Sequence, residues 1–128
     1  MKNLNQSDII SLKRQKLGKL SIPTIEGFLI LELNNILYLQ SDNSYTTIFL
    51  SDNSKVTSSR NLGFFEDILL PEPFLRVHNS FIINLNKVVK YIRGDDGYII
   101  LNNGTPIRVS RSKRDELLEF FSIARSKG

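Results

Sequence analysis

The sequence predicts a mostly β domain with a few short helices. Several short runs are rich in β-branched and aromatic residues, and clusters of Asn, Asp, Ser and Gly separate them. No part of the chain alternates strand, helix and strand in the way that builds a parallel sheet. We therefore expect short antiparallel strands with small helices packed against them.

Length and composition are those of one ordinary globular domain. The chain has 128 residues, of which 41% are hydrophobic and 23% charged, and this is enough to bury a core without disulfides or metals. It contains no cysteine, which excludes a disulfide framework and thiolate metal sites and permits the cytoplasmic location that we expect. No apolar run approaches the roughly 18 residues of a membrane-spanning helix.

The start of the chain is interpreted as a linker. Its apolar residues show only a weak helical periodicity, which the basic run at residues 13–16 interrupts before Pro23 closes the segment. We expect residues 1–22 to follow a missing upstream domain and residues 23–128 to form the folded domain. From Gly27 onward the pattern changes to strands separated by polar turns. The expected strands lie at 28–33, 36–40, 45–50, 55–58, 74–77, 88–93, 98–101 and 105–109.

Two helices are expected among these strands. Ser59 can cap the first, which runs to Leu70 and ends at Pro71 and Pro73. Its apolar residues share one helical face: Leu62, Phe65 and Leu69. Ser110 or Ser112 begins the second. Its residues expected to face the core are Leu117, Leu118, Phe121 and Ala124. A single helical turn is also expected between Ser80 and Asn84. Pro106 restricts the last strand to a sheet edge.

Basic residues concentrate toward the two ends of the chain. Residues 1–27 hold five Lys and Arg against two acids, residues 28–75 hold two against six, and residues 76–128 hold ten against five. A polyanionic partner would contact the basic segments. A solvated basic surface gives the same distribution, so both interpretations stay open.

The sequence offers little for catalysis. Phosphate-binding glycine motifs and the GxSxG elbow are absent, and His78, the only histidine, has no neighbouring cysteine or histidine. We expect His78 to be a hydrogen-bonding loop residue that supports its neighbours. The turn at 94–97 lacks the ligand spacing of an EF-hand and is interpreted as a plain turn. We predict no enzyme, no cofactor and no metal site.

Basic residues stand at the start of the last helix. Arg111, Lys113 and Arg114 oppose the helix dipole, so helix stability does not explain them. Free amides with cations at a helix start favour a phosphate, although a solvated face remains the alternative. The side chain of Asn79 can pair with adenine and that of Arg111 with guanine.

The segment Phe74–Asn84 resembles the signature of LytTR-type DNA-binding domains. Gly97–Leu101 and Val109–Arg111 fit the same pattern, as do Tyr45 after its polar loop and Leu62 on its helix. These motifs occur in the family's order and at its spacing.

The resemblance covers about residues 22 to 122 and implies a transcription regulator domain. Its fold would be an elongated arrangement of small antiparallel sheets with two to three short helices, and its loops would enter successive grooves of double-stranded DNA. The implied base contacts are Tyr45, Asn79 and Arg111. The implied phosphate contacts are Asn61, Arg76, Ser80, Lys113 and Arg114.

The resemblance also implies a biological setting. Such domains commonly follow a receiver domain in a two-component response regulator and bind paired direct repeats. We expect the isolated domain to be a monomer or a weak dimer, with no membrane partner. The alternative is a protein-interaction module that pairs a β-edge with a partner and does not contact DNA. That alternative predicts an exposed apolar patch or an open sheet edge.

Overall fold

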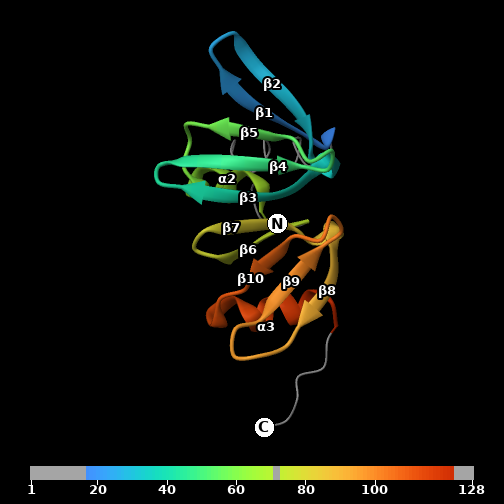
Figure 1. Cartoon of the computed structure of the whole chain (residues 1–128). Coiled ribbons are helices and arrows are strands. Elements are labelled where there is room, and N and C mark those ends of the chain that lie inside the picture. Colours follow the sequence, from blue (N-terminus) through green and yellow to red (C-terminus); the bar gives the residue numbers. More distant parts are fainter. Residues whose placement is uncertain (1–16, 71–72, 123–128) are drawn as a thin grey trace, which may run out of the picture.

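The structure is a computed structural model that describes residues 17–70 and 73–122 (Figure 1). Three small antiparallel sheets follow one another along the molecule. A hairpin stands at one end, a five-stranded sheet occupies the middle, and a three-stranded sheet with the last helix forms the other end. The prediction of an elongated, mostly β domain with short helices is confirmed.

The elements are as follows. The hairpin pairs β1 (Lys19–Thr24) with β2 (Gly27–Glu32). The five-stranded sheet contains, in spatial order, β5 (Lys55–Ser58), β4 (Tyr45–Leu50), β3 (Ile36–Asp42), β7 (Phe81–Asn84) and β6 (Phe74–His78). The three-stranded sheet contains β10 (Pro106–Arg108), β9 (Tyr98–Leu101) and β8 (Val88–Ile92). The helices are α2 (Leu62–Leu69) and α3 (Arg111–Phe120), with 3-10 turns at Leu33–Asn35 and Leu85–Lys87.

Strand β1 differs from the prediction. The sequence predicts that Lys19 to Ile22 belong to the linker, but they pair with β2 in a continuous antiparallel register. Leu20 and Ile22 alternate with exposed residues and are buried in the core. Their period of two is a strand signal, and Pro23 is tolerated because an edge position can spare its N–H. The rest of the predicted linker, residues 1–16, lies outside the described residues.

Strand β7 is the second difference. The helical turn expected between Ser80 and Asn84 is a strand, which pairs with β3 on one side and β6 on the other. A run of Phe81, Ile82 and Ile83 suits a central strand that is covered on both faces. Asn84 is buried at its end and donates from Nδ2 to the carbonyl of Ile36 (2.9 Å). The helical turn follows later, at Leu85–Lys87.

The two helices form close to their predicted positions. Asn61 caps α2 in place of Ser59, because its Oδ1 accepts a hydrogen bond from the backbone N–H of Phe64 (2.9 Å). Ser110 occupies the N-cap position of α3. Leu117 and Leu118 are buried as predicted, whereas Phe121 is 37% exposed and does not face the core. Pro71 and Ala124 lie outside the described residues.

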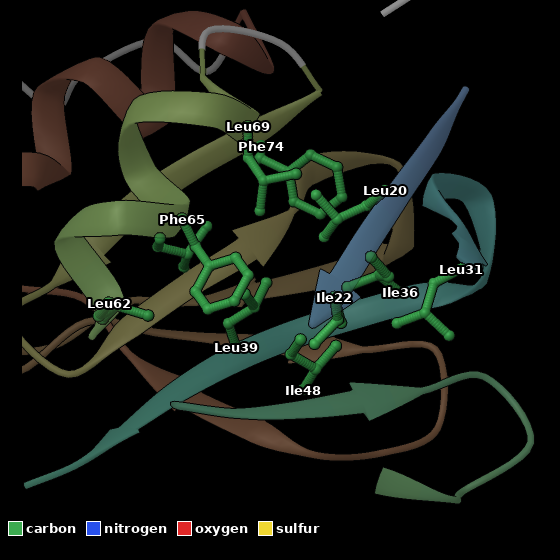
Figure 2. Close-up of a cluster of buried hydrophobic side chains, with 11 residues drawn as sticks. Leu20, Ile22, Leu31, Ile36, Leu39, Ile48, Leu62, Phe65, Leu69 and Phe74 are labelled. Carbon is green, nitrogen blue, oxygen red and sulfur yellow. The ribbon is translucent and has the colours of Figure 1, made fainter. Parts of the chain in front are cut away.

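Two hydrophobic clusters cover opposite faces of the five-stranded sheet. The first lies under α2 and the hairpin, as Figure 2 shows: Leu20, Ile22, Leu31, Ile36, Leu39, Ile48, Leu62, Phe65, Leu69, Phe74 and Ile82. The second joins the sheet to the three-stranded sheet and α3. Its members include Leu37, Val77, Ile83, Ile99, Leu101, Ile107 and Leu117. Strands β3 and β7 contribute to both clusters.

Candidate nucleic-acid interface

Three predicted contact loops lie along one edge of the molecule, on the left in Figure 1. The backbone N–H of Ser41, at the end of β3, donates to the carbonyl of Ser80 in the β6–β7 turn (2.9 Å). The N–H of Ser110, before α3, donates to the carbonyl of Val77 in β6 (2.8 Å). These two bonds fix the spacing of the β3–β4 turn, the β6–β7 turn and the start of α3. We call this surface the loop edge.

Tyr45 marks one end of this row. It is the first residue of β4, lies opposite Asp42 across the turn, and is 51% exposed. Its neighbour Thr46 is buried, and Thr46 Oγ1 donates to the carbonyl of Arg60 (2.8 Å). An open groove of about 960 Å³ runs between Tyr45 and the hairpin. The ring of Tyr45 is therefore accessible while its backbone is held.

The β6–β7 turn is held by its own side chains. Arg76 donates from Nη2 to the carbonyl of Asn79 (2.6 Å) and from Nε to that of His78 (3.4 Å), and its Nη1 pairs with Glu66 Oε1 (2.8 Å). The Nδ1 of His78 accepts from the backbone N–H of Ser80 (3.1 Å). The prediction that His78 supports its neighbours is confirmed. Asn79 stands exposed at the tip of the turn.

The start of α3 supplies the third loop with positive charge. The side chain of Arg111 is exposed and forms no hydrogen bond or ion pair with any residue that the structure describes. Lys113 lies 3.9 Å from Glu116 Oε1, a loose pair. Arg114 turns inward, where Nη2 donates to the carbonyl of Asp95 (2.9 Å) and Nε is buried with no partner among the described residues. Arg111 and Lys113 are thus the cations most available to a ligand.

Two residues at the start of α2 extend the loop edge. Asn61 is exposed, and its side-chain oxygen is used by the helix cap. Arg60 precedes it and places its guanidinium 4.9 Å from the ring centre of Phe64. The sequence interpretation missed Arg60. The sequence pattern that could have identified it is a basic residue directly before a helix cap. The free backbone N–H groups at a helix start can bind a phosphate there.

Electrostatic shifts lie away from the loop edge. Burial raises the pKa of Tyr38, which stacks on Phe49 with ring centres 4.3 Å apart. Hydrogen bonds from Ser54 lower the pKa of Asp52 in the β4–β5 turn. Within the described residues, no three acidic or histidine side chains gather as a metal site would require.

Accessible side chains on held loops, with cations at a helix start, are the features of a nucleic-acid-binding domain. The chain belongs to the LytTr DNA-binding domain family, whose match spans residues 26–122. The predicted family is therefore confirmed. Since this family is defined by binding DNA, the prediction that the chain is not an enzyme is confirmed as well.

Relatives of known role are transcriptional regulators. The heme-containing CO-sensing transcriptional regulator RcoM 1 of Paraburkholderia xenovorans is 29% identical over 112 residues, which cover 85% of this chain and 42% of that protein. The transcriptional regulatory protein LytR of Staphylococcus aureus is 35% identical over 86 residues, which cover 65% of this chain and 34% of LytR. This chain thus spans less than half the length of either relative.

A solved structure shares the fold. It is the LytTr DNA-binding domain of a Bacillus cereus protein described as a methyl-accepting/DNA response regulator. The two folds superpose with a TM-score of 0.68 at 22% identity, over 81% of this chain and 96% of the other. Among the described helices, none is long and apolar enough to cross a membrane.

Proposed function

We propose that this domain binds double-stranded DNA sequence-specifically and regulates transcription as the output domain of a two-component response regulator. The observation that carries the proposal is the loop edge, where two backbone hydrogen bonds align three loops with exposed polar or basic tips. Side chains carried on fixed loops can reach base edges in successive grooves of one duplex.

The tips of the loops are assigned to the bases. Asn79 has a donor and an acceptor suited to adenine, and Arg111 has the fork suited to guanine. Tyr45 offers an aromatic face and one hydroxyl, which suit apolar contact with a thymine methyl or a hydrogen bond. In this proposal the three side chains enter grooves, and no recognition helix lies in the major groove.

Phosphate contacts are assigned to the residues around the tips. Asn61, Ser80 and Lys113 face solvent at least partly and retain donors. Arg76 and Arg114 gain a second role, because each already holds a loop carbonyl within the domain. We assign to these two arginines the positioning of the loops as well as attraction of the backbone phosphates.

The setting of the whole protein is part of the proposal. A response regulator is named in the Bacillus cereus relative, and LytR is named as a transcriptional regulatory protein. By analogy, a receiver domain controls this domain in the cytoplasm, and two copies occupy paired direct repeats. The isolated domain would be a monomer or a weak dimer.

Selection from a random pool of duplexes tests this function. We expect recovery of a repeated motif, followed by binding whose logarithm falls with the logarithm of salt at a slope of about −0.9 per phosphate neutralised. A pool that yields no motif, or binding that does not change with salt, would contradict sequence-specific DNA recognition. The pool also reports whether the motifs are direct repeats.

The alternative function is a protein-interaction module that pairs a β-edge without contacting DNA, and one observation favours its β-edge pairing. Strand β2 has no partner on its outer side among the described strands, and apolar side chains line it. This edge lies on the hairpin (Figure 1), and at Phe28 it adjoins the groove that Tyr45 also lines. It supports a protein contact that accompanies DNA binding.

A further inference from the structure

The outer edge of β2 is unpaired among the described strands. Opposed residues of an antiparallel pair alternate between bonded and non-bonded pairs. The N–H of Leu33 donates to the carbonyl of Gly18 (2.9 Å), in register with the hairpin. Counting from that bond, the backbone groups of Phe28, Ile30 and Glu32 point away from β1. An open edge with unused donors and acceptors is a template for strand addition.

The side chains of this edge are apolar and acidic. Phe28 is 70% exposed and Ile30 is 54% exposed, on the same side of β2. A groove of about 470 Å³ is lined by Ile30, Glu32 and Asp52. Glu32 accepts a hydrogen bond from Asn35 Nδ2 (3.4 Å) and forms no ion pair with a described residue. The groove therefore suits a basic side chain with an apolar stem.

The opposite end of the molecule carries a complementary edge. Strand β8 is one of the two outer strands of the three-stranded sheet, far from the hairpin (Figure 1), and its register shifts between Val88 and Lys90. Val89 is 64% exposed and Ile92 is 41% exposed. Lys90 and Arg93 are exposed and form no ion pair with a described residue. These cations are not part of the three contact loops, so the proposed DNA contacts leave them unused.

We propose that β2 of one copy pairs edge to edge with β8 of a second copy. Phe28 and Ile30 would pack against Val89 and Ile92 of the next copy. Lys90 of that copy would enter the acidic groove. The contact itself does not depend on the proposed DNA-binding function. Its use on direct repeats does rest on that function: copies joined head to tail would all present their loop edges to the DNA in one direction.

Charge separates this arrangement from a symmetric one. A two-fold antiparallel pairing of β2 with β2 centred on Ile30 would place each Glu32 opposite Phe28 of the other copy, so neither carboxylate would gain a cation across the strands. Pairing β2 with β8 brings acids to bases and apolar residues to apolar residues. A contact between two different surfaces joins copies head to tail. Copies bound to direct repeats are related in the same way.

Cross-linking of introduced cysteines tests the contact, since the chain has none of its own. An Ile30→Cys chain is mixed with a Val89→Cys chain and treated with a short bifunctional maleimide, at high protein concentration and on two-site DNA. We expect the mixed dimer to dominate. The matched control pairs Ile30→Cys with Lys55→Cys, which lies on the edge strand β5. Dominant Ile30→Cys homodimers, or mixed dimers no stronger than the control, would overturn the proposal.

Cooperativity provides a second test with charge reversals. Glu32→Lys and Lys90→Glu should each lower affinity for two-site DNA at least fivefold relative to one-site DNA, since coupling of this kind spans about 5–150-fold. The double variant Glu32→Lys with Lys90→Glu restores opposite charges and should recover cooperativity. Equal losses on one-site and two-site DNA would assign these residues to DNA contact and overturn the inference.

The two failures can be told apart. If selection recovers no DNA motif but the mixed dimer forms without DNA, the proposed function fails and the contact between copies stands. If a motif is recovered and the chain binds two sites without cooperativity or cross-linking, the function stands and the contact is refuted.

Discussion

The β6–β7 turn and the first turn of α3 lie on the same edge but are held in different ways. In the β6–β7 turn, the side chains of Arg76 and His78 form hydrogen bonds with the turn's own backbone. At α3 the backbone of Ser110 is tied to β6, while the side chain of Arg111 has no partner among the described residues.

This difference separates two tasks within one binding surface. A turn fixed by internal bonds presents Asn79 in one geometry, which costs little entropy when a ligand binds. A free arginine keeps its hydrogen-bonding capacity for the ligand but must be ordered on binding. The first arrangement favours precision, and the second favours a strong charged contact. Mutations should therefore affect stability at one loop and affinity at the other.

The largest expected effect comes from the strand beneath the turn. Ile83→Ala removes a fully buried side chain from β7 and leaves a cavity in the second cluster. We expect the free energy of unfolding to fall by about 2–5 kcal/mol, as measured by urea denaturation. The same change at Ile25, which is fully exposed at the hairpin tip, is the control and should have little effect. Equal effects would mean that the buried side chain of Ile83 stabilises the domain no more than the exposed side chain of Ile25.

Arg76→Ala tests the held turn itself. The change leaves the carbonyls of His78 and Asn79 without their donor and separates Glu66 from its partner. We expect a loss of about 1–3 kcal/mol in unfolding free energy, with the exposed part of the ion pair contributing little. Arg76→Lys should not restore stability, because an ammonium cannot match the guanidinium fork. Unchanged stability with reduced DNA affinity would instead assign Arg76 to phosphate contact alone.

Arg111→Ala should give the opposite result. Stability should stay within about 0.5 kcal/mol, since the side chain is exposed. Affinity for the selected DNA should fall by about 1–3 kcal/mol, with relaxed preference at one position. Fluorescence anisotropy with a panel of single-base variants measures both. Lys113→Ala is the matched comparison: it should weaken all sequences alike and reduce the salt slope by about 1. If Arg111→Ala instead lowered affinity for all sequences equally, Arg111 would be assigned to phosphate contact rather than to a base.

The smallest effect is expected at the β4–β5 turn, which resembles the β6–β7 turn in being held by side chains. Hydrogen bonds from the hydroxyl and N–H of Ser54 lower the pKa of Asp52 below its ordinary value of 3.8. The contribution to stability is thus present above that value and is lost as the pH falls through the lowered pKa. NMR titration should locate this pKa. The stability difference between the chain and Asp52→Asn should shrink on acidification, and a constant difference would contradict it.

The sequence predicted most strands because their signals are local. Tyr45–Leu50, Lys55–Ser58 and Tyr98–Leu101 form as expected, since β-branched and aromatic runs stand between clear turn residues. The family and the mostly β class followed from those runs and from the motif order.

The two missed strands had competing local signals. In β1 the alternation of Leu20 and Ile22 was outweighed by Pro23 and the basic residues before it. In β7 the serine at position 80 resembled a helix cap, and only pairing with two distant strands shows otherwise. Tertiary contacts decide such short segments.

The candidate site was predictable in its parts but not in its connections. Tyr45, Asn79 and Arg111 do lie at one edge, and their contacts with DNA stay predictions. The inward turn of Arg114 toward the carbonyl of Asp95 depends on a loop nineteen residues away in the sequence. Likewise, the anchor from Arg76 to Glu66 depends on the packing of α2 beside β6. No local pattern encodes either contact.

The sharing of β3 and β7 by both hydrophobic clusters has a consequence for local opening. Because neither face can be uncovered without exposing these strands, their amides should exchange with solvent only when the whole domain unfolds. The β1–β2 hairpin contributes to one cluster only, so we expect it to open separately. Hydrogen exchange should therefore divide the chain into a slow centre and a faster hairpin, which lets the hairpin change partners while the loop edge keeps its shape.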